Sequence, residues 1–406
     1  MRVLIVNIYG QKRSIGKITT LQYEFLKSKG YEVRVAYRGV QEPQIDNPDY
    51  IAVCGNIEPY LGHIAYKVSG YEGSVYPIAT RRLMKLTEQF KPDVVQLNNL
   101  HGNFINSSDY IYFLNRHKIP AVYTMVDEYP YMGSCCYSYG CNQFMEGCTI
   151  KCPYNYRNLL FDKTKYVWEK KKKAYDGYEN IVFTGPRWVV NRAKQSALLK
   201  NKRIVEIDEP ISFHKYYYPK DREKLREKLG IPKNNIIIVT VTQMSSKPKG
   251  GRFFYEAAKI LENRKDLTFV YVGLDCDEPC HVENLIAIPY VHSDEELADY
   301  FSLGDVLVST SLADTQANTC LEAMGCGTPL IVFDAMGMPY IATEDTAVIV
   351  ESQNVKALAE AFERVTKKNE KIIKTCRDYA LGRYSPEVVM GKITSIYDTL
   401  LERKTL

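Results

Sequence analysis

The pattern that decides the fold lies in residues 2–37, which read RVLIVNIYGQKRSIGKITTLQYEFLKSKGYEVRVAY. A short apolar run, Val3–Val6, leads into a loop with Gly16, and apolar residues then recur at helical spacing. Gly30 ends the helical pattern, and a second apolar run covers residues 33–37. A strand, a helix and a strand in this order predict a parallel sheet that is covered by helices.

The same alternation continues along the 406 residues and starts afresh after residue 210. At roughly 150 residues per domain, two doubly wound halves fit this length better than one large sheet. We expect an α/β protein with Rossmann-like domains at residues 1–210 and 211–386, and a final helix, residues 387–406, that packs back on the first half. The other expected strands are Val94–Leu97, Ala121–Thr124, Ile181–Phe183, Ile236–Val241, Leu267–Val272, Leu285–Ile288, Val306–Ser309 and Leu330–Phe333.

Open parallel sheets bind ligands at the carboxyl ends of their strands. Two such sheets that face each other would form a cleft between the domains. A cleft of this kind suits an enzyme with two substrates.

The composition excludes several classes of protein. Apolar residues make up 45% and charged residues 25% of the chain, which is typical of a globular protein and not of a disordered, collagenous or small disulfide-rich one. No apolar run reaches the about 18 to 20 residues that cross a bilayer, and the first run is too short for a signal peptide, so we expect a cytoplasmic protein. The net charge of +5 is too small to indicate nucleic-acid binding.

The most informative segment for function is residues 311–329, SLADTQANTCLEAMGCGTP. It follows an expected strand and opens a helix, so Asp314 should lie at the helix mouth and Glu322 about two turns inside. Free amides of a first helical turn can hold an anion such as a phosphate, and two carboxylates can bind hydroxyl groups. A capped helix with a solvated Glu322 would show the same spacing. The amides concerned are those of Ala317, Asn318 and Thr319.

A second segment with the chemistry of a phosphate site is residues 242–252, TQMSSKPKGGR. It follows an expected strand, its small residues allow close approach of the backbone to a diphosphate, and Lys247 and Lys249 supply positive charge. The spacing of a Walker loop is absent. A solvated basic turn is the alternative interpretation.

Cysteines gather in one loop rich in Tyr, Gly and Asn. Four of them, Cys135, Cys141, Cys148 and Cys152, could close a tetrahedral structural zinc site. Reduced thiols or a partial disulfide would explain the loop equally well, since the spacing is not that of two tight Cys-x2-Cys pairs. Cys136 belongs to the same loop.

Two further features remain open at the level of sequence. His101 directly follows an expected strand and precedes a glycine, which is typical of a ligand-binding position but also of a core or capping histidine. Residues 163–173 form a basic helical pattern with the run Lys170–Lys173 and interleaved aromatic residues. Such a helix could lie on an anionic membrane, or it could be an ordinary solvated face.

Residues 311–329 resemble the acidic–seven–acidic motif of glycosyltransferase family 4, which contains retaining enzymes of the GT-B fold. Asp314 stands where the family usually has Glu, and residues 333–339 resemble the family's continuation. The resemblance implies that Asp314 and nearby amides hold the donor sugar and that Glu322 binds the ribose of the nucleotide.

The resemblance extends over nearly the whole chain. Residues 14–18 are similar to the glycine loop after the family's first strand, which places Gly16 at the donor. Residues 100–103 and 124–135 resemble a subgroup typified by colanic-acid-type polysaccharide glycosyltransferases, which implies that His101 and Asp127 line the acceptor and reaction side. Lys249 matches the family's lysine at the diphosphate.

Two positions depart from the family pattern. Val126 stands where a histidine is expected, and Met244 stands where an arginine is expected in the phosphate loop. Lys247 could replace that arginine. The departures put one donor-sugar contact in doubt and weaken the diphosphate site.

The resemblance implies a retaining glycosyltransferase that moves a sugar from a UDP- or GDP-sugar to a polysaccharide or a lipid-linked oligosaccharide. No cofactor is required for catalysis, and a structural zinc ion is the one metal expected. The protein would be cytoplasmic or peripheral at the inner membrane face, with no nucleic-acid partner. The alternatives are a phosphorylase or epimerase of the same fold, or a degenerate sugar-binding partner without turnover.

Overall fold

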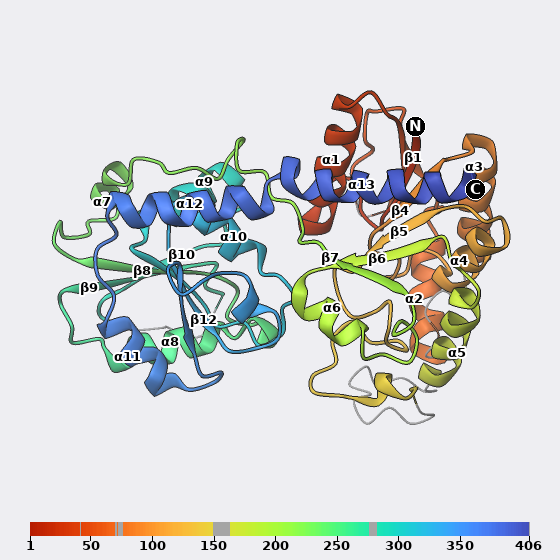
Figure 1. The fold of residues 1–406 in the computed structure, drawn as a ribbon. Helices are drawn as coiled ribbons and strands as arrows, with labels where there is room; N and C mark the ends of the chain where they lie inside the picture. The colour runs from red at the N-terminus through yellow and green to blue at the C-terminus, as the bar shows by residue number, and fades with distance from the viewer. Residues whose placement is uncertain (41, 70, 72–75, 149–162, 276–281, 406) are drawn as a thin grey trace. The chain divides into compact units, whose positions relative to one another are not determined.

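The computed structural model describes residues 1–40, 42–69, 71, 76–148, 163–275 and 282–405 (Figure 1). The chain forms two compact units. The first consists of Met1–Pro210 and Val389–Leu406, and the second of Ile211–Val388. Each unit contains a parallel sheet with helices packed against it, and each is described by itself below.

The first unit contains a seven-stranded sheet of order β3-β2-β1-β4-β5-β6-β7, in which all neighbours are parallel. The strand order reverses between β1 and β4. The strands are β1 (Arg2–Val6), β2 (Glu32–Tyr37), β3 (Tyr50–Ala52), β4 (Val94–Leu97), β5 (Ala121–Thr124), β6 (Ile181–Gly185) and β7 (Arg203–Glu206). The helices are α1 (Arg13–Ser28), α2 (Glu58–Ser69), α3 (Pro77–Phe90), α4 (Ser107–Arg116), α5 (Thr164–Tyr175) and α6 (Arg187–Ala193), with a 3-10 turn η1 (Gln143–Met145).

The second unit contains a six-stranded parallel sheet of order β10-β9-β8-β11-β12-β13. Here the order reverses between β8 and β11. The strands are β8 (Ile236–Val241), β9 (Leu267–Val272), β10 (Leu285–Ile288), β11 (Val306–Ser309), β12 (Leu330–Phe333) and β13 (Ala347–Val350). The helices are α7 (Glu223–Lys228), α8 (Gly251–Ile260), α9 (Asp294–Leu303), α10 (Asn318–Gly325), α11 (Val355–Glu363) and α12 (Glu370–Tyr384), with 3-10 turns η2 (Lys247–Lys249) and η3 (Met338–Tyr340).

The last helix, α13 (Pro386–Thr405), packs on the sheet of the first unit. Val389, Ile393 and Tyr397 are buried there among residues of β1 and β2, and the Tyr397 hydroxyl donates to Gln96 Oε1 of β4 at 2.8 Å. In Figure 1 the helix runs along the sheet beside β1 and β4. The contact combines apolar burial with a satisfied buried hydroxyl, so the C-terminal segment is part of the core of this unit.

The expected strands are all present, and the structure adds three more. β3, β7 and β13 are edge strands, and each pairs with one neighbour. Their burial is mixed, and β7 (RIVE) lacks the continuous apolar run that marks a central parallel strand. The short apolar runs of β3 (YIA) and β13 (AVIV) were not recognised as strands from the sequence.

Candidate functional site

A pocket of about 290 Å³ lies in the second unit, where β8, β9 and β11 end. This is the point at which the strand order reverses, and open α/β sheets bind ligands there. Polar residues from two loops and from α10 share its wall. They are Thr242, Ser246, Lys249, Thr310, Asp314 and Thr319.

The predicted phosphate loop, residues 242–252, is hydrogen-bonded to the loop after β11. Gly250 has a φ of 65°, and a Cβ at this position would lie 2.1 Å from the Thr310 carbonyl oxygen. The Thr310 hydroxyl donates to the Gly250 carbonyl at 2.8 Å, and the Leu312 N–H donates to Pro248 O at 2.8 Å. Only glycine allows this close approach, so the two loops form one rigid wall.

Lys249 and Asp314 meet across these two loops. The Lys249 Nζ lies 2.6 Å from Asp314 Oδ2, and the two side chains are 48% and 13% exposed. Lys247 is exposed on η2 and does not line the pocket, and Met244 packs against the apolar core instead. The structure therefore brings together one of the two predicted lysines and the first acidic residue of the motif.

Helix α10 points its first turn at this region. Thr319 lines the pocket, while Ala317 is its buried N-cap residue without a side-chain cap. Within the described part of the chain, Asn318 Oδ1 and Thr242 Oγ1 are buried and have no hydrogen-bond partner. Buried polar atoms are nearly always paired, so two such atoms beside one pocket are typical of a site that a polar ligand completes.

Glu322 lies on the second turn of α10 and is only 8% exposed. The Tyr217 hydroxyl donates to Asp294 Oδ1 at 2.9 Å and also forms a hydrogen bond with Glu322. Burial, reinforced by the two carboxylates, raises the pKa of Tyr217 well above its ordinary value. The alternative of a solvated Glu322 is therefore wrong. No sequence pattern indicated Tyr217 or Asp294 as part of this site.

The segment after β12 supports the acidic loop. The Gly337 N–H donates to the Asp314 carbonyl at 2.9 Å, and a Cβ on Gly337 would lie 1.9 Å from the Thr315 carbonyl oxygen. Residues 333–339 thus hold the backbone that carries Asp314.

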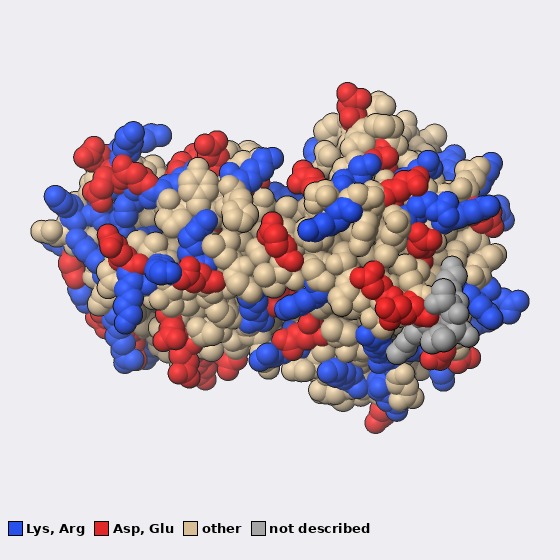
Figure 2. Space-filling view, turned by 45° about the horizontal axis from the view of Figure 1, so that its top comes forward, with Lys and Arg blue, Asp and Glu red and all other residues tan. Residues whose placement is uncertain are grey.

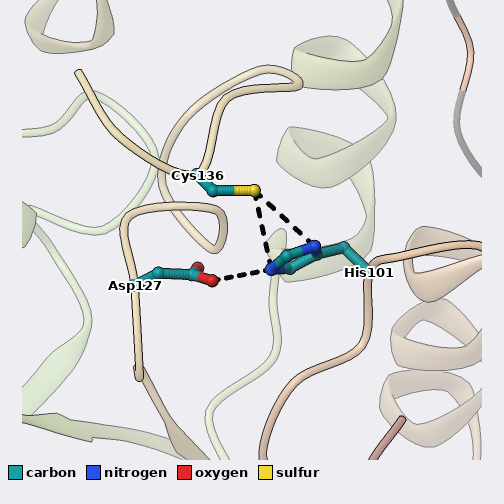
Figure 3. A group of neighbouring side chains, drawn as sticks. All are labelled: His101, Asp127 and Cys136. Atoms are coloured by element: carbon teal, nitrogen blue, oxygen red, sulfur yellow. Dashed lines mark hydrogen bonds and ion pairs between the residues drawn. The ribbon is translucent and has the colours of Figure 1, made fainter. Parts of the chain in front are cut away.

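A second polar cluster lies in the first unit and consists of His101, Asp127 and Cys136 (Figure 3). His101 follows β4 and Asp127 follows β5, and these strands are neighbours. The His101 Nε2 lies 2.6 Å from Asp127 Oδ2, and the Cys136 sulfur lies 3.6 Å from both ring nitrogens. The parallel register brings the two predicted residues together, and the loop adds a thiol whose role sequence analysis did not anticipate.

The charges around His101 favour its protonated ring. Burial alone disfavours the imidazolium, but electrostatic interaction with Cys136 and Asp127 and hydrogen bonds to both outweigh burial. The pKa of His101 therefore lies well above its ordinary value.

The loop that carries Asp127 and Cys136 is held by buried charges. Glu128 is fully buried and accepts hydrogen bonds from Arg192 Nε at 2.9 Å, from the Tyr131 hydroxyl at 3.0 Å and from the Ser138 N–H. On α5, the Lys171 ammonium donates to the carbonyls of Met132 and Gly133, at 3.0 and 2.9 Å, and to that of Tyr129.

This burial corrects one prediction. Lys171 is 2% exposed, so the run Lys170–Lys173 is not a uniform surface. Lys170 is half-buried and ion-paired with Asp109 at 3.3 Å, whereas Lys172 and Lys173 are exposed. Only part of the basic run is accessible to a membrane.

Residues 14–18, which were predicted as the glycine loop, lie in α1, and the turn before them already holds an anion from its own chain. The N–H groups of Gly10, Gln11 and Lys12 donate to the Glu42 carboxylate at 2.8, 2.7 and 2.7 Å. Gly16 is buried in the first turn of α1, where a Cβ would lie 2.5 Å from the Gln11 backbone. A glycine is therefore needed at position 16 so that the helix can pack against the preceding loop.

The cysteine loop is described in part. Cys141 and Cys148 are buried, and Cys135 packs partly buried against the same apolar cluster. Cys152 lies outside the described residues. The four-cysteine zinc site therefore stays a prediction.

Comparison with known proteins is informative for the second unit. Residues 235–368 match the family described as glycosyl transferases group 1. The chain is 25% identical over 252 residues to the D-inositol 3-phosphate glycosyltransferase of Geodermatophilus obscurus, which covers 56% of this chain and 55% of the relative. It thus spans about half the length of the curated relatives of this kind that it matches.

Solved structures resemble the chain over almost its full length. Sucrose-phosphate synthase of Thermosynechococcus elongatus aligns with a TM-score of 0.70 at 16% identity, over 99% of both chains. HepE of Anabaena, solved in complex with UDP, aligns with a TM-score of 0.65 at 14% identity, over 98% of this chain and 100% of that chain. The chain therefore has the α/β GT-B fold that the sequence predicted, with two parallel-sheet, Rossmann-like units, and its pocket-bearing residues 235–368 match glycosyl transferases group 1.

Proposed function

We propose that the protein is a retaining glycosyltransferase that moves a sugar from a nucleotide diphosphate sugar to a polysaccharide or a lipid-linked oligosaccharide. The observation that carries this proposal is the pocket at the β8–β11 reversal. The pocket combines an exposed lysine, a carboxylate and the start of a helix, and it lies within the segment that matches glycosyl transferases group 1. The same likeness indicates a transferase enzyme.

In this proposal the donor binds to the second unit. Lys249 and the amides of Ala317, Asn318 and Thr319 hold the diphosphate, with Lys247 as a more distant positive charge. Asp314 accepts hydrogen bonds from sugar hydroxyls, and Glu322 accepts them from the ribose. HepE was solved with UDP, which makes a UDP-sugar the first donor to test and a GDP-sugar the second.

The ion pair in the pocket sets a condition on donor binding. Lys249 is nearly half exposed, so its ammonium can leave Asp314 for a diphosphate at little cost in desolvation. Asp314 then becomes free to accept hydrogen bonds from the sugar. One movement of Lys249 would thus prepare both halves of the donor site.

Catalysis would be electrostatic. Lys249 and the helix amides stabilise the charge that develops on the leaving diphosphate, without a metal at that position. Retention follows from front-face attack, in which the leaving phosphate takes the proton of the acceptor hydroxyl. His101 and Asp127 of the first unit are proposed to line the acceptor and reaction side, and Gly16 shapes the loop that faces the donor.

A peripheral membrane site of action is part of the proposal. No helix within the described residues is long and apolar enough to span a bilayer. Lys165, Lys172 and Lys173 of α5 are exposed. Ile57, just before α2, and Tyr60, Leu61, Ile64 and Val68 of α2 are exposed apolar residues at helical spacing. Tyr71, two residues beyond α2, stacks edge-on with Tyr166 of α5 at 5.2 Å between ring centroids. Apolar and basic groups on adjoining elements are typical of a surface that binds an anionic bilayer.

Nucleic acid is not a proposed partner. Lys and Arg side chains are interspersed with Asp and Glu side chains over the face that Figure 2 shows. With a net charge of only +5, this mixture does not form the continuous basic track that nucleic-acid binding requires.

The test is a donor screen followed by a turnover assay. UDP- and GDP-sugars are titrated by calorimetry against the parent and Lys249→Met, and nucleotide release is then measured with and without a glycan acceptor. We expect one donor to bind, Lys249→Met to weaken it by about 10- to 100-fold, and release to require the acceptor. Binding without turnover would favour the degenerate binding partner, products formed without an acceptor would favour an epimerase, and no binding at all would refute the proposal.

A further inference from the structure

His101, Asp127 and Cys136 offer three kinds of metal-ligand atom at one point. One imidazole nitrogen, one carboxylate oxygen and one sulfur lie within 4.8 Å of one another. Figure 3 shows the carboxylate and the sulfur approaching the same ring nitrogen of His101 from different directions. Zn²⁺ takes all three ligand types, and its catalytic and exchangeable sites use three protein ligands with one open position.

Two side chains from different residues make opposite demands on the Nε2 atom of His101. Asn99 Oδ1 accepts the His101 N–H at 3.1 Å, which orients the Asn99 Nδ2 donor toward His101 Nε2 at 3.0 Å. The same nitrogen faces Asp127 Oδ2 at 2.6 Å. A proton on Nε2 suits Asp127 but opposes Asn99, whereas a bare lone pair opposes the carboxylate. A divalent cation attracts the lone pair, the carboxylate and the sulfur together.

Each ligand is also held in place by a second interaction. Asp127 Oδ1 accepts the Tyr129 N–H at 2.9 Å, which leaves Oδ2 directed at the cluster. The Cys136 carbonyl accepts the Glu128 N–H at 3.0 Å, so the backbone that carries the thiol is fixed. Such outer contacts preorganise metal ligands, and their loss typically weakens metal binding by about 10- to 100-fold.

Access and charge are compatible with an ion. The His101 and Asp127 side chains are 17% and 10% exposed, so the cluster can take a fourth ligand from solvent. Binding of the ion would release the protons of Cys136 and His101, and the resulting thiolate, carboxylate and neutral imidazole carry two negative charges, which a divalent cation balances. The soft sulfur favours zinc over magnesium or calcium.

We propose that His101 Nε2, Asp127 Oδ2 and Cys136 Sγ form a site for Zn²⁺ or a similar borderline-soft divalent ion, with a fourth position open to water or a ligand. This site is separate from the predicted set of Cys135, Cys141, Cys148 and Cys152. It uses the one cysteine of the described loop that the four-cysteine prediction leaves aside.

A consequence for activity rests on the proposed function. The ion would occupy two groups that are assigned to the acceptor and reaction side, so zinc lowers the transfer rate and a chelator restores it. The two ideas fail separately. A chain that binds the ion but never transfers sugar would refute the proposed function and leave the site standing.

The test uses Co²⁺ alone as a spectroscopic probe on the full chain, prepared metal-free under reducing conditions. Thiolate-bound cobalt shows sulfur-to-metal charge-transfer absorption, which reports coordination by cysteine directly. We expect the parent to bind one equivalent more than Cys136→Ser. The same difference of one equivalent is expected between Cys135→Ser and the Cys135→Ser/Cys136→Ser double variant, because the two sites are independent.

A second pair of variants guards against misfolding of the serine variant. Asp127→Asn keeps the thiol and removes a charged ligand, which should weaken cobalt binding, whereas Asn99→Ala removes a donor that competes for the Nε2 lone pair and should not weaken it. Circular dichroism of the metal-free proteins checks the fold. Equal cobalt binding by the parent, Cys136→Ser and Asp127→Asn would overturn the inference and leave the cluster as a hydrogen-bonded His–Asp pair.

Discussion

The buried ion pair behind the His101 cluster allows a quantitative prediction. Arg192 of α6 donates from Nε to Glu128 at 2.9 Å and from Nη2 to the Cys141 carbonyl at 3.0 Å, and its guanidinium lies 4.5 Å from the Phe144 ring centroid. Glu128 is 0% exposed. Arg192→Met keeps the packing volume but leaves a buried carboxylate without its cation. Removal of one partner of a buried pair costs about 3–5 kcal/mol.

The same helix provides a matched control. Arg187 pairs with Glu206 at 3.0 Å, but these side chains are 53% and 38% exposed. An exposed pair contributes about 0–1 kcal/mol, so Arg187→Met should be nearly neutral. In thermal unfolding, we expect Arg192→Met to lower the transition of the first unit by on the order of 10 °C and Arg187→Met to leave it almost unchanged.

A double variant separates charge from packing. Glu128→Gln in the Arg192→Met background removes the stranded charge, so it should recover part of the lost stability, measured as a coupling energy by urea denaturation. Equal losses for Arg192→Met and Arg187→Met would refute this reasoning. A double variant less stable than Arg192→Met alone would also refute it, since the stranded charge would then not be the cause.

Three further predictions concern ligands and loops. By calorimetry, Glu322→Ala should weaken the binding of UDP and of UDP-sugar alike by about 1.5–3 kcal/mol. Asp314→Ala should weaken only the extra binding free energy that the sugar contributes. Equal losses for both ligands in both variants would contradict this division of roles. Gly250→Ala should lower both thermal stability and UDP affinity, because its Cβ would meet the Thr310 carbonyl. Gly230 has a similar φ of 66° but no atom within 4 Å of its Cβ position, so Gly230→Ala should cost only the backbone strain of about 1 kcal/mol and leave UDP affinity unchanged. At low salt, fewer protein molecules should sediment with anionic vesicles when three exposed lysines of α5 are changed to Gln, whereas the same change of three exposed lysines in the second unit should have no effect. Equal sedimentation of the two triple variants would exclude a basic membrane contact. The α5 set is Lys165, Lys172 and Lys173, and the control set is Lys224, Lys228 and Lys259.

The central strands and the acidic loop were predictable because their signals are local. A buried apolar run marks each central strand, and the fixed spacing of Asp314 and Glu322 survives in the structure as a loop and a helix. Of the edge strands, β10 was predicted in the same way, β7 has no such run, and the short apolar runs of β3 and β13 were not recognised. Contacts between distant segments, such as Lys249 with Asp314 or Cys136 with His101, depend on which loops the sheet brings together and leave no trace in either segment alone.

The burial of Lys171 had a signal that composition concealed. Val167, Trp168, Lys171, Ala174 and Tyr175 follow helical spacing and form the buried face of α5. Within the run of four lysines, periodicity therefore distinguishes Lys171 from its neighbours. Its carbonyl partners, which come from a loop about forty residues earlier, could not be read from the sequence.

The carboxylate of Glu42 competes with any external anion for the N–H groups of Gly10, Gln11 and Lys12. Because Glu42 is joined to Lys12 through 30 residues of the same folded unit, its effective concentration at the three amides is set by the chain and not by the surrounding solution. An inorganic anion that arrives alone must displace this tethered group by its own affinity. A ligand that is already anchored elsewhere on the protein is itself tethered, so we expect these amides to favour an anion carried by a larger bound molecule over a free anion.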